Sequence, residues 1–310
     1  MEKDAKIFVA GHRGLVGSAI VRNLIAQGYT NLLLKTREEL DLLQFDAVQT
    51  FFSTEKPNYV FLAAAKVGGI HANNTKGADF IYENLTLQNN VIKSAHDVHV
   101  KKLLFLGSSC IYPRDCPQPM KEEYFLTGKF EETNAPYAAA KIAGILMCRA
   151  FHKQYGDNFI SIMPTNLYGP NDNFDLQTSH VFPALIRKFY EAKASNAPTI
   201  TVWGTGKPRR EFLHVDDLAS AAIFLMNTYN DPEIVNIGTG VDVSIREFAE
   251  LIKEVSKYPG EIVWDGSKPD GMPQKLLDVT KVNNLGWEAN IKLRKGIVQT
   301  LDWYSEHVHA

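Results

Sequence analysis

Cysteine is scarce in this 310-residue chain, and the spacing of its cysteines argues against two structures that cysteine often builds. Cys110, Cys116 and Cys148 are odd in number, and they form no CxxC pair and have no companion pair of histidines. Neither a disulfide framework nor a zinc or other metal site is therefore expected. The three residues are predicted to be free thiols, one of which is a candidate for chemistry.

Long apolar runs and an excess of charge are also missing. No run approaches the eighteen or so apolar residues of a membrane span, and the apolar stretch at 7–10 is too short for a signal peptide. We therefore expect a cytoplasmic protein with no membrane partner. The 33 basic and 35 acidic residues nearly cancel, so no overall field attracts nucleic acid. An anionic ligand needs a local site.

The first half of the chain alternates short apolar runs with longer amphipathic segments, which is typical of βαβ units and a parallel sheet. Right-handed crossovers place helices on both faces of such a sheet and ligands at the carboxyl ends of its strands. The predicted fold class is α/β, a Rossmann-type doubly wound parallel sheet. Its expected strands are 6–10, 31–35, 59–63, 102–106 and 159–163, and its expected helices are 15–27, 44–55, 80–99 and 134–155.

The sequence changes character after about Asn171, where proline and glycine interruptions multiply. We predict a Rossmann domain over residues 1–170 and a smaller C-terminal substrate lobe over most of 171–310. A helical stretch at 214–227 and an apolar stretch at 235–238 are expected to return to the main sheet. The lobe is therefore expected to be discontinuous, with returning segments near 212–240.

A glycine-rich turn follows the first expected strand. Gly11, Gly14 and Gly17 stand between that strand and a helical pattern, which is the order that a dinucleotide site requires. Glycine permits a tight turn and the close approach of a pyrophosphate, whose charge is met by backbone N–H groups at the helix start. Any short βα turn can contain three glycines. The prediction of a dinucleotide site therefore depends on the position of these glycines directly after the first strand. The same turn contains His12, Arg13, Leu15 and Val16.

The second strand ends without the acidic residue with which an NAD-preferring site binds the ribose 2′-hydroxyl. Arg37 stands there instead, and with Arg13 it favours the 2′-phosphate of NADPH through charge-assisted hydrogen bonds. The alternative is that both are solvated loop arginines. The predicted cofactor is NADPH/NADP+, and further candidates to line its path are Asp41, Leu42, Ala63, Ala64 and Ala65.

Tyr137 and Lys141 are four residues apart in a helical pattern and therefore share a face. A nearby ammonium is expected to lower the pKa of the phenol, making it a usable acid for a carbonyl that receives hydride. Ser108, just after the fourth strand, can donate a hydrogen bond to the same oxygen. A YxxxK pair also occurs by chance on protein surfaces, but the strand-end serine and the upstream glycine turn favour a catalytic set.

Together these features resemble the extended short-chain dehydrogenase/reductases that modify nucleotide-sugars. More narrowly, nearly the whole chain is similar to the GDP-L-fucose synthase family. The most specific matches are AGHRG at 10–14, AKVGGI at 65–70, GSSCIYP at 107–113, MPTNLYGP at 163–170, SH at 179–180 and REFLHVDD at 210–217.

The resemblance implies an NADP-dependent oxidoreductase with epimerase activity. Its substrate would be GDP-4-keto-6-deoxy-D-mannose, which is epimerised at C3 and C5 and then reduced at the C4 ketone by NADPH to give GDP-L-fucose. The resemblance also implies a homodimer, formed through helices 80–99 and 134–155 in a four-helix contact.

Cys110 and His180 match the epimerisation acid and base of this family. Removing a hydrogen at C3 or C5 gives an enolate whose charge falls on the oxygen held by Ser108 and Tyr137. Cys110 as thiolate would be a base, and His180 would deliver a proton on the opposite face, because inversion needs a second group. Which residue acts at which carbon stays open.

The resemblance also implies two sets of binding residues. The family often has arginine where Lys188 stands, so a bidentate contact is lost there. The GDP contacts would be Lys188, Trp203, Arg210, Asp270 and Lys275. The implied cofactor contacts beyond the glycine turn are Leu106, Gly107, Lys141, Pro164, Thr165, Asn166, Leu167 and His180.

Other functions fit the residues less well. A 4,6-dehydratase of the same superfamily would carry an Asp-Glu pair where Ser109 and Cys110 stand, and a 4-epimerase would retain NAD and need neither Cys110 nor His180. A catalytically silent NADP-binding protein would be marked by loss of Tyr137 or Lys141, and both are present. Asp216 and Asp217, at a helix start, are interpreted as capping residues.

Overall fold

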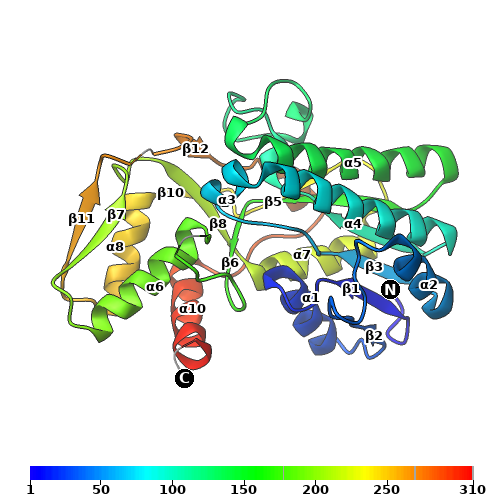
Figure 1. The fold of residues 1–310 in the computed structure, drawn as a ribbon, viewed down its shortest axis with the longest axis horizontal. Coiled ribbons are helices and arrows are strands. Elements are labelled where there is room, and N and C mark those ends of the chain that lie inside the picture. The colour runs from blue at the N-terminus through cyan, green and yellow to red at the C-terminus, as the bar shows by residue number, and fades with distance from the viewer. Residues whose placement is uncertain (177, 269, 309–310) are drawn as a thin grey trace.

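A six-stranded parallel sheet forms the larger part of the molecule (Figure 1). The structure, a computed structural model, describes residues 1–176, 178–268 and 270–308. The strand order is β2-β1-β3-β4-β5-β9, and every pairing is parallel. The strands are β1 (Ile7–Ala10), β2 (Leu32–Leu33), β3 (Tyr59–Leu62), β4 (Lys102–Leu106), β5 (Phe159–Pro164) and β9 (Val235–Ile237). β2 is shorter than expected because, at the edge of the sheet, it pairs with β1 over two residues.

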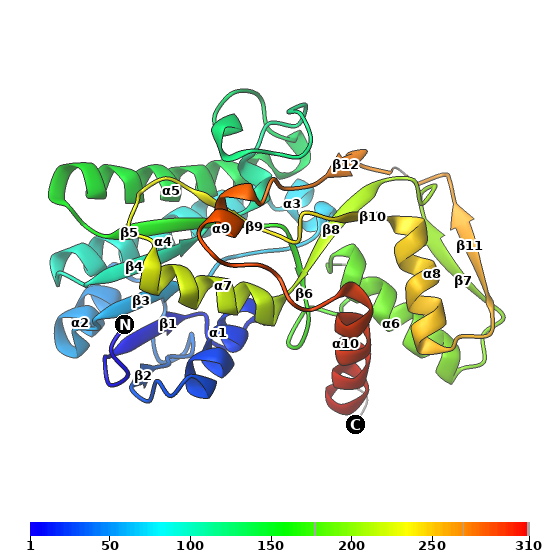
Figure 2. The ribbon, with the colours of Figure 1, turned by 180° about the vertical axis from the view of Figure 1, so that it is seen from behind.

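Helices cover both faces of this sheet (Figures 1 and 2). Helices α1 (Leu15–Ala26) and α7 (Val215–Thr228) pack together on one face. On the other face, α4 (Gly77–Asp97) packs against both α2 (Phe45–Glu55) and α5 (Ala135–Tyr155). Successive strand residues point to opposite faces, so Ile7 and Val9 enter one core while Phe8 and Ala10 enter the other. The predicted doubly wound α/β fold is thus confirmed.

Short helical segments connect the strands where the chain crosses the carboxyl edge of the sheet or returns to it. None of them exceeds six residues in length. They are α3 (Ile70–Thr75), η1 (Ser109–Ile111), η2 (Glu122–Tyr124), η3 (Glu132–Asn134) and α9 (Thr280–Asn284).

A smaller unit lies beside the carboxyl ends of the main sheet, on the left of Figure 1. Its central strand, β8 (Arg209–His214), pairs with β6 (Asn166–Tyr168), β10 (Asp242–Ser244) and β12 (Gln274–Lys275). Strands β7 (Thr199–Trp203) and β11 (Glu261–Asp265) form a separate parallel pair. The helices are α6 (Val181–Ala194), α8 (Ile245–Ser256) and α10 (Leu293–His307).

An aromatic core holds the smaller unit together. Tyr168 stacks on Phe182 with ring centroids 3.8 Å apart, and Phe182 and Phe212 both contact Phe248. These rings come from β6, α6, β8 and α8. β6 follows β5 almost directly, and β8 runs straight into α7. The aromatic core is therefore anchored at the carboxyl edge of the main sheet, and β8 connects the two units.

The start of α7 differs from the sequence prediction, because Asp216 and Asp217 do not cap the helix. The N-cap is His214, whose Nδ1 accepts the N–H of Asp216 at 3.2 Å. Asp216 pairs instead with Arg22 on α1 at 2.6 Å, and Asp217 accepts the backbone N–H groups of 290–291. The capping interpretation was wrong, since the imidazole reaches the first free N–H and leaves both carboxylates for long-range contacts.

Candidate active site

The β1–α1 turn has no room for side chains at two of its glycines. Gly11 has φ +82°, and a Cβ added to it would lie 2.8 Å from the Cα of Ala64. A Cβ added to Gly17 would lie 2.6 Å from the carbonyl carbon of Gly11. Helix α1 begins directly after Gly14, so the N–H groups of its first turn have no intrahelical acceptor. This turn has the shape and the donors to receive a diphosphate.

Arg13 lies in this turn, and its charge acts on the loop that carries Arg37. Arg13 is exposed. The pKa of Glu39 is held below its ordinary value by hydrogen bonds with Thr36 and, to a smaller extent, by nearby positive charges that include Arg13. Arg13 is therefore near the loop that carries Arg37. Arg37 is exposed as well, and its Nε lies 3.8 Å from the Asp41 carboxylate, a long contact. Both guanidiniums stay candidates for an anion at the end of β2.

The other candidate cofactor residues lie at the carboxyl ends of neighbouring strands. The chain runs from β3 into 63–65, where the N–H of Ala63 donates to Ala10 at 3.1 Å. Leu106 ends β4 and Gly107 follows it, Pro164 ends β5 and Thr165 follows it, and Asn166 and Leu167 begin β6. Leu42 accepts a hydrogen bond from Asn90 at 2.9 Å. The parallel register brings these separate sequence segments to one edge of the sheet.

Ser108, Tyr137 and Lys141 meet beside the end of β4. Tyr137 shares a side-chain hydrogen bond with Ser108. The ammonium of Lys141 donates to the carbonyl of Leu106 at 2.8 Å and lies 5.9 Å from the centre of the Tyr137 ring. The i,i+4 spacing on α5 thus places both side chains at one point.

Burial changes the acidity of this pair in a way that the sequence did not indicate. Desolvation, with a smaller contribution from Cys110, raises the pKa of Tyr137 even though the Ser108 hydrogen bond opposes the shift. Desolvation also lowers the pKa of Lys141 to about 7. The expectation that the ammonium lowers the phenol pKa was therefore wrong for this structure, because both groups are removed from water. A raised pKa keeps the phenol protonated, which is the form that donates a proton.

Cys110 and His180 are connected through Lys275. The backbone N–H of Cys110 donates to Ser108 Oγ at 3.2 Å, and Cys110 acts electrostatically on Tyr137. The Nζ of Lys275 lies 3.5 Å from Cys110 Sγ. Desolvation, and then the charge of Lys275, lower the pKa of His180, which is the N-cap of α6. The thiol, the ammonium and the imidazole therefore belong to one group.

Four of the five predicted GDP contacts gather around Trp203. This ring is 64% exposed, and the ammonium of Lys188 lies 5.8 Å from its centre. Asp270 accepts the N–H of Thr205, two residues after Trp203, at 2.7 Å, and it acts electrostatically on Arg210. The surface offers an aromatic face edged by cations. The fifth predicted contact, Lys275, is the register partner of Arg210, but its side chain reaches Cys110.

Glu211, on β8, is a buried charged residue that the sequence did not single out. Its side chain is fully buried, and one carboxylate oxygen accepts the N–H groups of Thr239 and Gly240 at 2.6 and 2.8 Å. The other oxygen accepts the N–H of Leu277 at 3.0 Å. Burial raises the pKa of Glu211 while these donors hold it down. The available signal was a charged residue next to Phe212 in a strand pattern, and glutamate is rarely buried without partners.

Two kinds of site do not occur among the residues that the structure describes. No group of three or more His, Cys, Asp and Glu side chains within 1–176, 178–268 and 270–308 could hold a metal ion. In the same ranges no helix is long and apolar enough to cross a membrane.

Known proteins resemble this chain over nearly its full length. Residues 7–238 match the model of the NAD dependent epimerase/dehydratase family. GDP-L-fucose synthase 1 of Arabidopsis thaliana is 61% identical over 99% of this chain and 95% of its own length. GDP-L-fucose synthase of Escherichia coli (strain K12) is 54% identical over 97% of each chain. The structure of MlghC, a GDP-mannoheptose C4 reductase from Campylobacter jejuni with NADP bound, has a TM-score of 0.92 and 44% identity, and the match covers 98% of this chain and 99% of MlghC.

Proposed function

The chain belongs to the NAD dependent epimerase/dehydratase family, and we propose that it converts GDP-4-keto-6-deoxy-D-mannose to GDP-L-fucose as an NADP-dependent oxidoreductase with epimerase activity. The full-length relatives named GDP-L-fucose synthase support this function. The observation that carries this proposal is that the residues expected to reduce a ketone, Ser108 and Tyr137, lie beside Cys110. Ser108 shares a hydrogen bond with Tyr137 and accepts the backbone N–H of Cys110, so a ketone oxygen held by Ser108 and Tyr137 would lie near the residue that carries the thiol.

NADPH is the cofactor of this proposal. The β1–α1 turn fits its diphosphate, because a Cβ at Gly11 or Gly17 would fill the space, and the exposed Arg13 and Arg37 are the cations that would pair with its 2′-phosphate. The NADP-bound MlghC structure supports the same assignment. When bound, the cofactor supplies the hydride that reduces C4.

Epimerisation uses the acidity of hydrogens next to the ketone. Cys110 as thiolate takes a proton from C3 or C5, and the C–H electron pair moves to the C4 oxygen. Ser108 and Tyr137 donate hydrogen bonds to that oxygen and stabilise its charge. His180 then gives a proton to the opposite face of the carbon. The imidazolium is the form that donates, so His180 takes up a proton from solvent before it gives one to carbon, and its lowered pKa makes it a stronger acid.

Reduction uses the same oxygen a second time. Tyr137 keeps its proton because burial raises its pKa, and it gives that proton to the C4 oxygen as the ketone is reduced. Lys141 donates to Leu106 and lies against the Tyr137 ring, so it holds the phenol in place.

The GDP portion occupies the surface around Trp203 in this proposal. Trp203 provides a stacking face, while Lys188 and Arg210 pair with phosphate oxygens. The Rossmann domain then covers residues 1–170 with returning segments near 212–240, and the substrate lobe covers most of 171–310. We place two copies of the chain in a dimer through α4 and α5.

Product analysis of three proteins tests the function. Wild-type protein with NADPH and GDP-4-keto-6-deoxymannose should consume NADPH and yield GDP-L-fucose. Tyr137→Phe should abolish NADPH consumption, whereas Cys110→Ser should reduce the ketone without complete epimerisation and yield a different deoxyhexose. No NADPH consumption by the wild type, or GDP-L-fucose at the normal rate from Cys110→Ser, would contradict the proposal.

A second candidate function is C4 reduction without epimerisation, since MlghC is named a C4 reductase. It predicts that even the wild-type product keeps the original configuration at C3 and C5. Nuclear magnetic resonance of the product separates the two functions.

A further inference from the structure

We propose that Lys275 is a positioning residue for Cys110, whose ammonium keeps the sulfur in the thiolate form that removes protons from carbon. This inference rests on the proposed function for its chemistry, although the contact itself can be tested without any sugar substrate. It also gives Lys275 a role different from the GDP contact that the sequence resemblance implies.

The geometry gives Cys110 a cationic neighbour from a distant part of the chain. Nζ of Lys275 and Sγ of Cys110 are 3.5 Å apart, within hydrogen-bond reach for sulfur, and the residues are separated by 165 positions. Both side chains are only partly exposed, so solvent screens the pair less than at an open surface. The thiolate rather than the thiol is the reactive form of cysteine, and a neighbouring lysine favours it.

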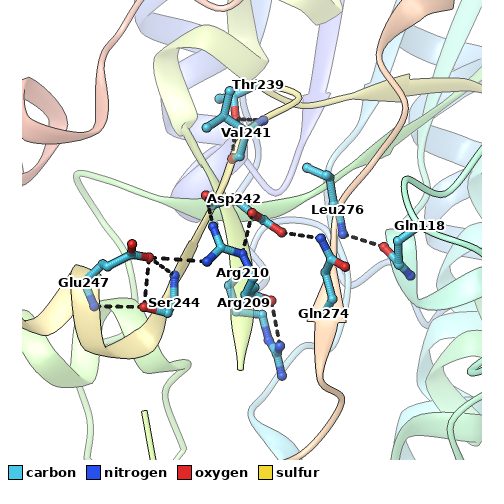
Figure 3. A network of polar contacts seen from close by, with 10 residues as sticks. All are labelled: Gln118, Arg209, Arg210, Thr239, Val241, Asp242, Ser244, Glu247, Gln274 and Leu276. Carbon is cyan, nitrogen blue, oxygen red and sulfur yellow. Dashed lines mark hydrogen bonds and ion pairs between the residues drawn. The ribbon is translucent and has the colours of Figure 1, made fainter. Parts of the chain in front are cut away.

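The residues on both sides of Lys275 make long-range hydrogen bonds, Gln274 through its side chain and Leu276 through its backbone (Figure 3). Gln274 donates to Asp242 at 2.6 Å, and the N–H of Leu276 donates to Gln118 Oε1 at 2.9 Å. One residue further, the N–H of Leu277 donates to the buried Glu211. A two-residue strand with no core side chain of its own is thus tied to three different segments. This arrangement fixes the point from which the lysine side chain starts.

Other cations are better placed for the GDP end. Lys188 and Lys268 lie 5.8 and 5.5 Å from the centre of the Trp203 ring, and Arg210 interacts with Asp270. Lys275 lies on β12 next to β8, its ammonium contacts Cys110, and its charge acts on His180. Lys275, for which the family resemblance implies a nucleotide contact, therefore lies next to the cysteine that is proposed to remove protons from carbon.

The proton balance of the step is simple. The carbon–hydrogen bond at C3 or C5 breaks, a sulfur–hydrogen bond forms on Cys110, and the electron pair moves to the C4 oxygen. Lys275 keeps all three of its ammonium protons throughout. The group beside it changes from a thiolate to a neutral thiol. Its contribution is the stabilisation of the thiolate before the proton is taken.

Alkylation of the cofactor-free protein tests the contact. Iodoacetamide is added near neutral pH, and mass spectrometry of peptides follows each cysteine separately. Lys275→Met should slow alkylation of Cys110 by roughly tenfold, and Lys275→Arg, which keeps a cation, should restore most of the rate. Cys116 serves as an internal control, because burial raises its pKa and Lys275 is not among the causes. An unchanged Cys110 rate in folded Lys275→Met would overturn the proposal.

Solvent-deuterium incorporation tests the consequence for catalysis. With saturating sugar nucleotide, the kcat for deuterium incorporation at C3 and C5 should fall in Lys275→Met, while NADPH oxidation continues. Lys268→Met is the matched control, since it removes a cation near Trp203 and should raise KM without slowing Cys110 alkylation. A raised KM with normal kcat for Lys275→Met would show a nucleotide contact instead and would refute the inference. If the wild type did not process this sugar, the proposed function would be wrong. The alkylation rates would still test the contact between Lys275 and Cys110.

Discussion

Tyr137 and Lys141 show how the surroundings of a residue decide its chemistry after the fold has placed it. Their spacing of four predicts a shared helix face, and the structure has them on one face of α5. The sequence could not indicate that Lys141 would be almost fully buried and would donate to the carbonyl of Leu106. Desolvation follows from packing against β4 and cannot be read from a local pattern.

Lys141 is expected to make cofactor use depend on pH. Its pKa is lowered to about 7 by burial, so the side chain is an ammonium below that pH and neutral above it. Since kcat/KM reports the ionisation of the free enzyme, kcat/KM for NADPH should fall as pH rises through about 7. Initial rates at saturating sugar nucleotide across this range provide the measurement.

Arginine at position 141 is the control for this pH dependence. Arginine keeps its charge throughout the range, so Lys141→Arg should show a lower but flat profile. A flat wild-type profile would mean that the charge of Lys141 does not matter for cofactor binding.

The secondary-structure elements that could be predicted from the sequence are those with a clear pattern of apolar residues. The strands β1, β3, β4 and β5 could be predicted because both of their faces are buried and nearly all of their residues are apolar. The two-residue strand β12 has no such pattern, and its place is set by partners distant in sequence. Ser108 and Cys110 stand close together in the sequence, whereas no local pattern indicates that the side chain of Lys275 reaches Cys110.

Replacing Glu211 with glutamine should weaken the connection between β8 and the segment after β12. Both carboxylate oxygens accept backbone N–H groups, from Thr239 and Gly240 on one side and from Leu277 on the other. A glutamine has one oxygen, so its NH₂ group would face a buried donor in either orientation. The free energy of unfolding should fall by about 1–3 kcal/mol, the usual cost of a buried unsatisfied group.

Urea unfolding measures this loss, and Glu247→Gln is the matched control. Glu247 lies in the exposed capping box of α8, where glutamine is an accepted substitute. The control should therefore unfold nearly as the wild type does. Equal stability of Glu211→Gln and wild type would show that the carboxylate is not needed to hold the two segments together.

In the whole molecule, the proposed catalytic groups come from both units. Ser108 and Tyr137 follow β4 and lie on α5 of the larger unit, whereas His180 and Lys275 come from segments of the smaller unit. Strand β8 and helix α7 connect the two, since β8 is central to one sheet and α7 covers the other (Figure 2). Cys110 lies on η1 of the larger unit, so the proposed epimerisation pair of Cys110 and His180 is divided between the units, and the distance between these two residues depends on how the units are placed.

The outer surface of α4 and α5 is the expected dimer interface. The two helices pack side by side on one face of the molecule, and they expose Tyr82 and Leu146 by 68% and 43% (Figure 1). A glutamate at position 146 would place an unpaired charge in the interface, so Leu146→Glu should shift the protein from dimer to monomer. Ile25→Glu is the control, because Ile25 is 60% exposed on α1, away from this surface. Sedimentation velocity at micromolar concentration distinguishes the two masses, and a monomeric wild type, or a dimeric Leu146→Glu variant, would place the interface elsewhere or remove it.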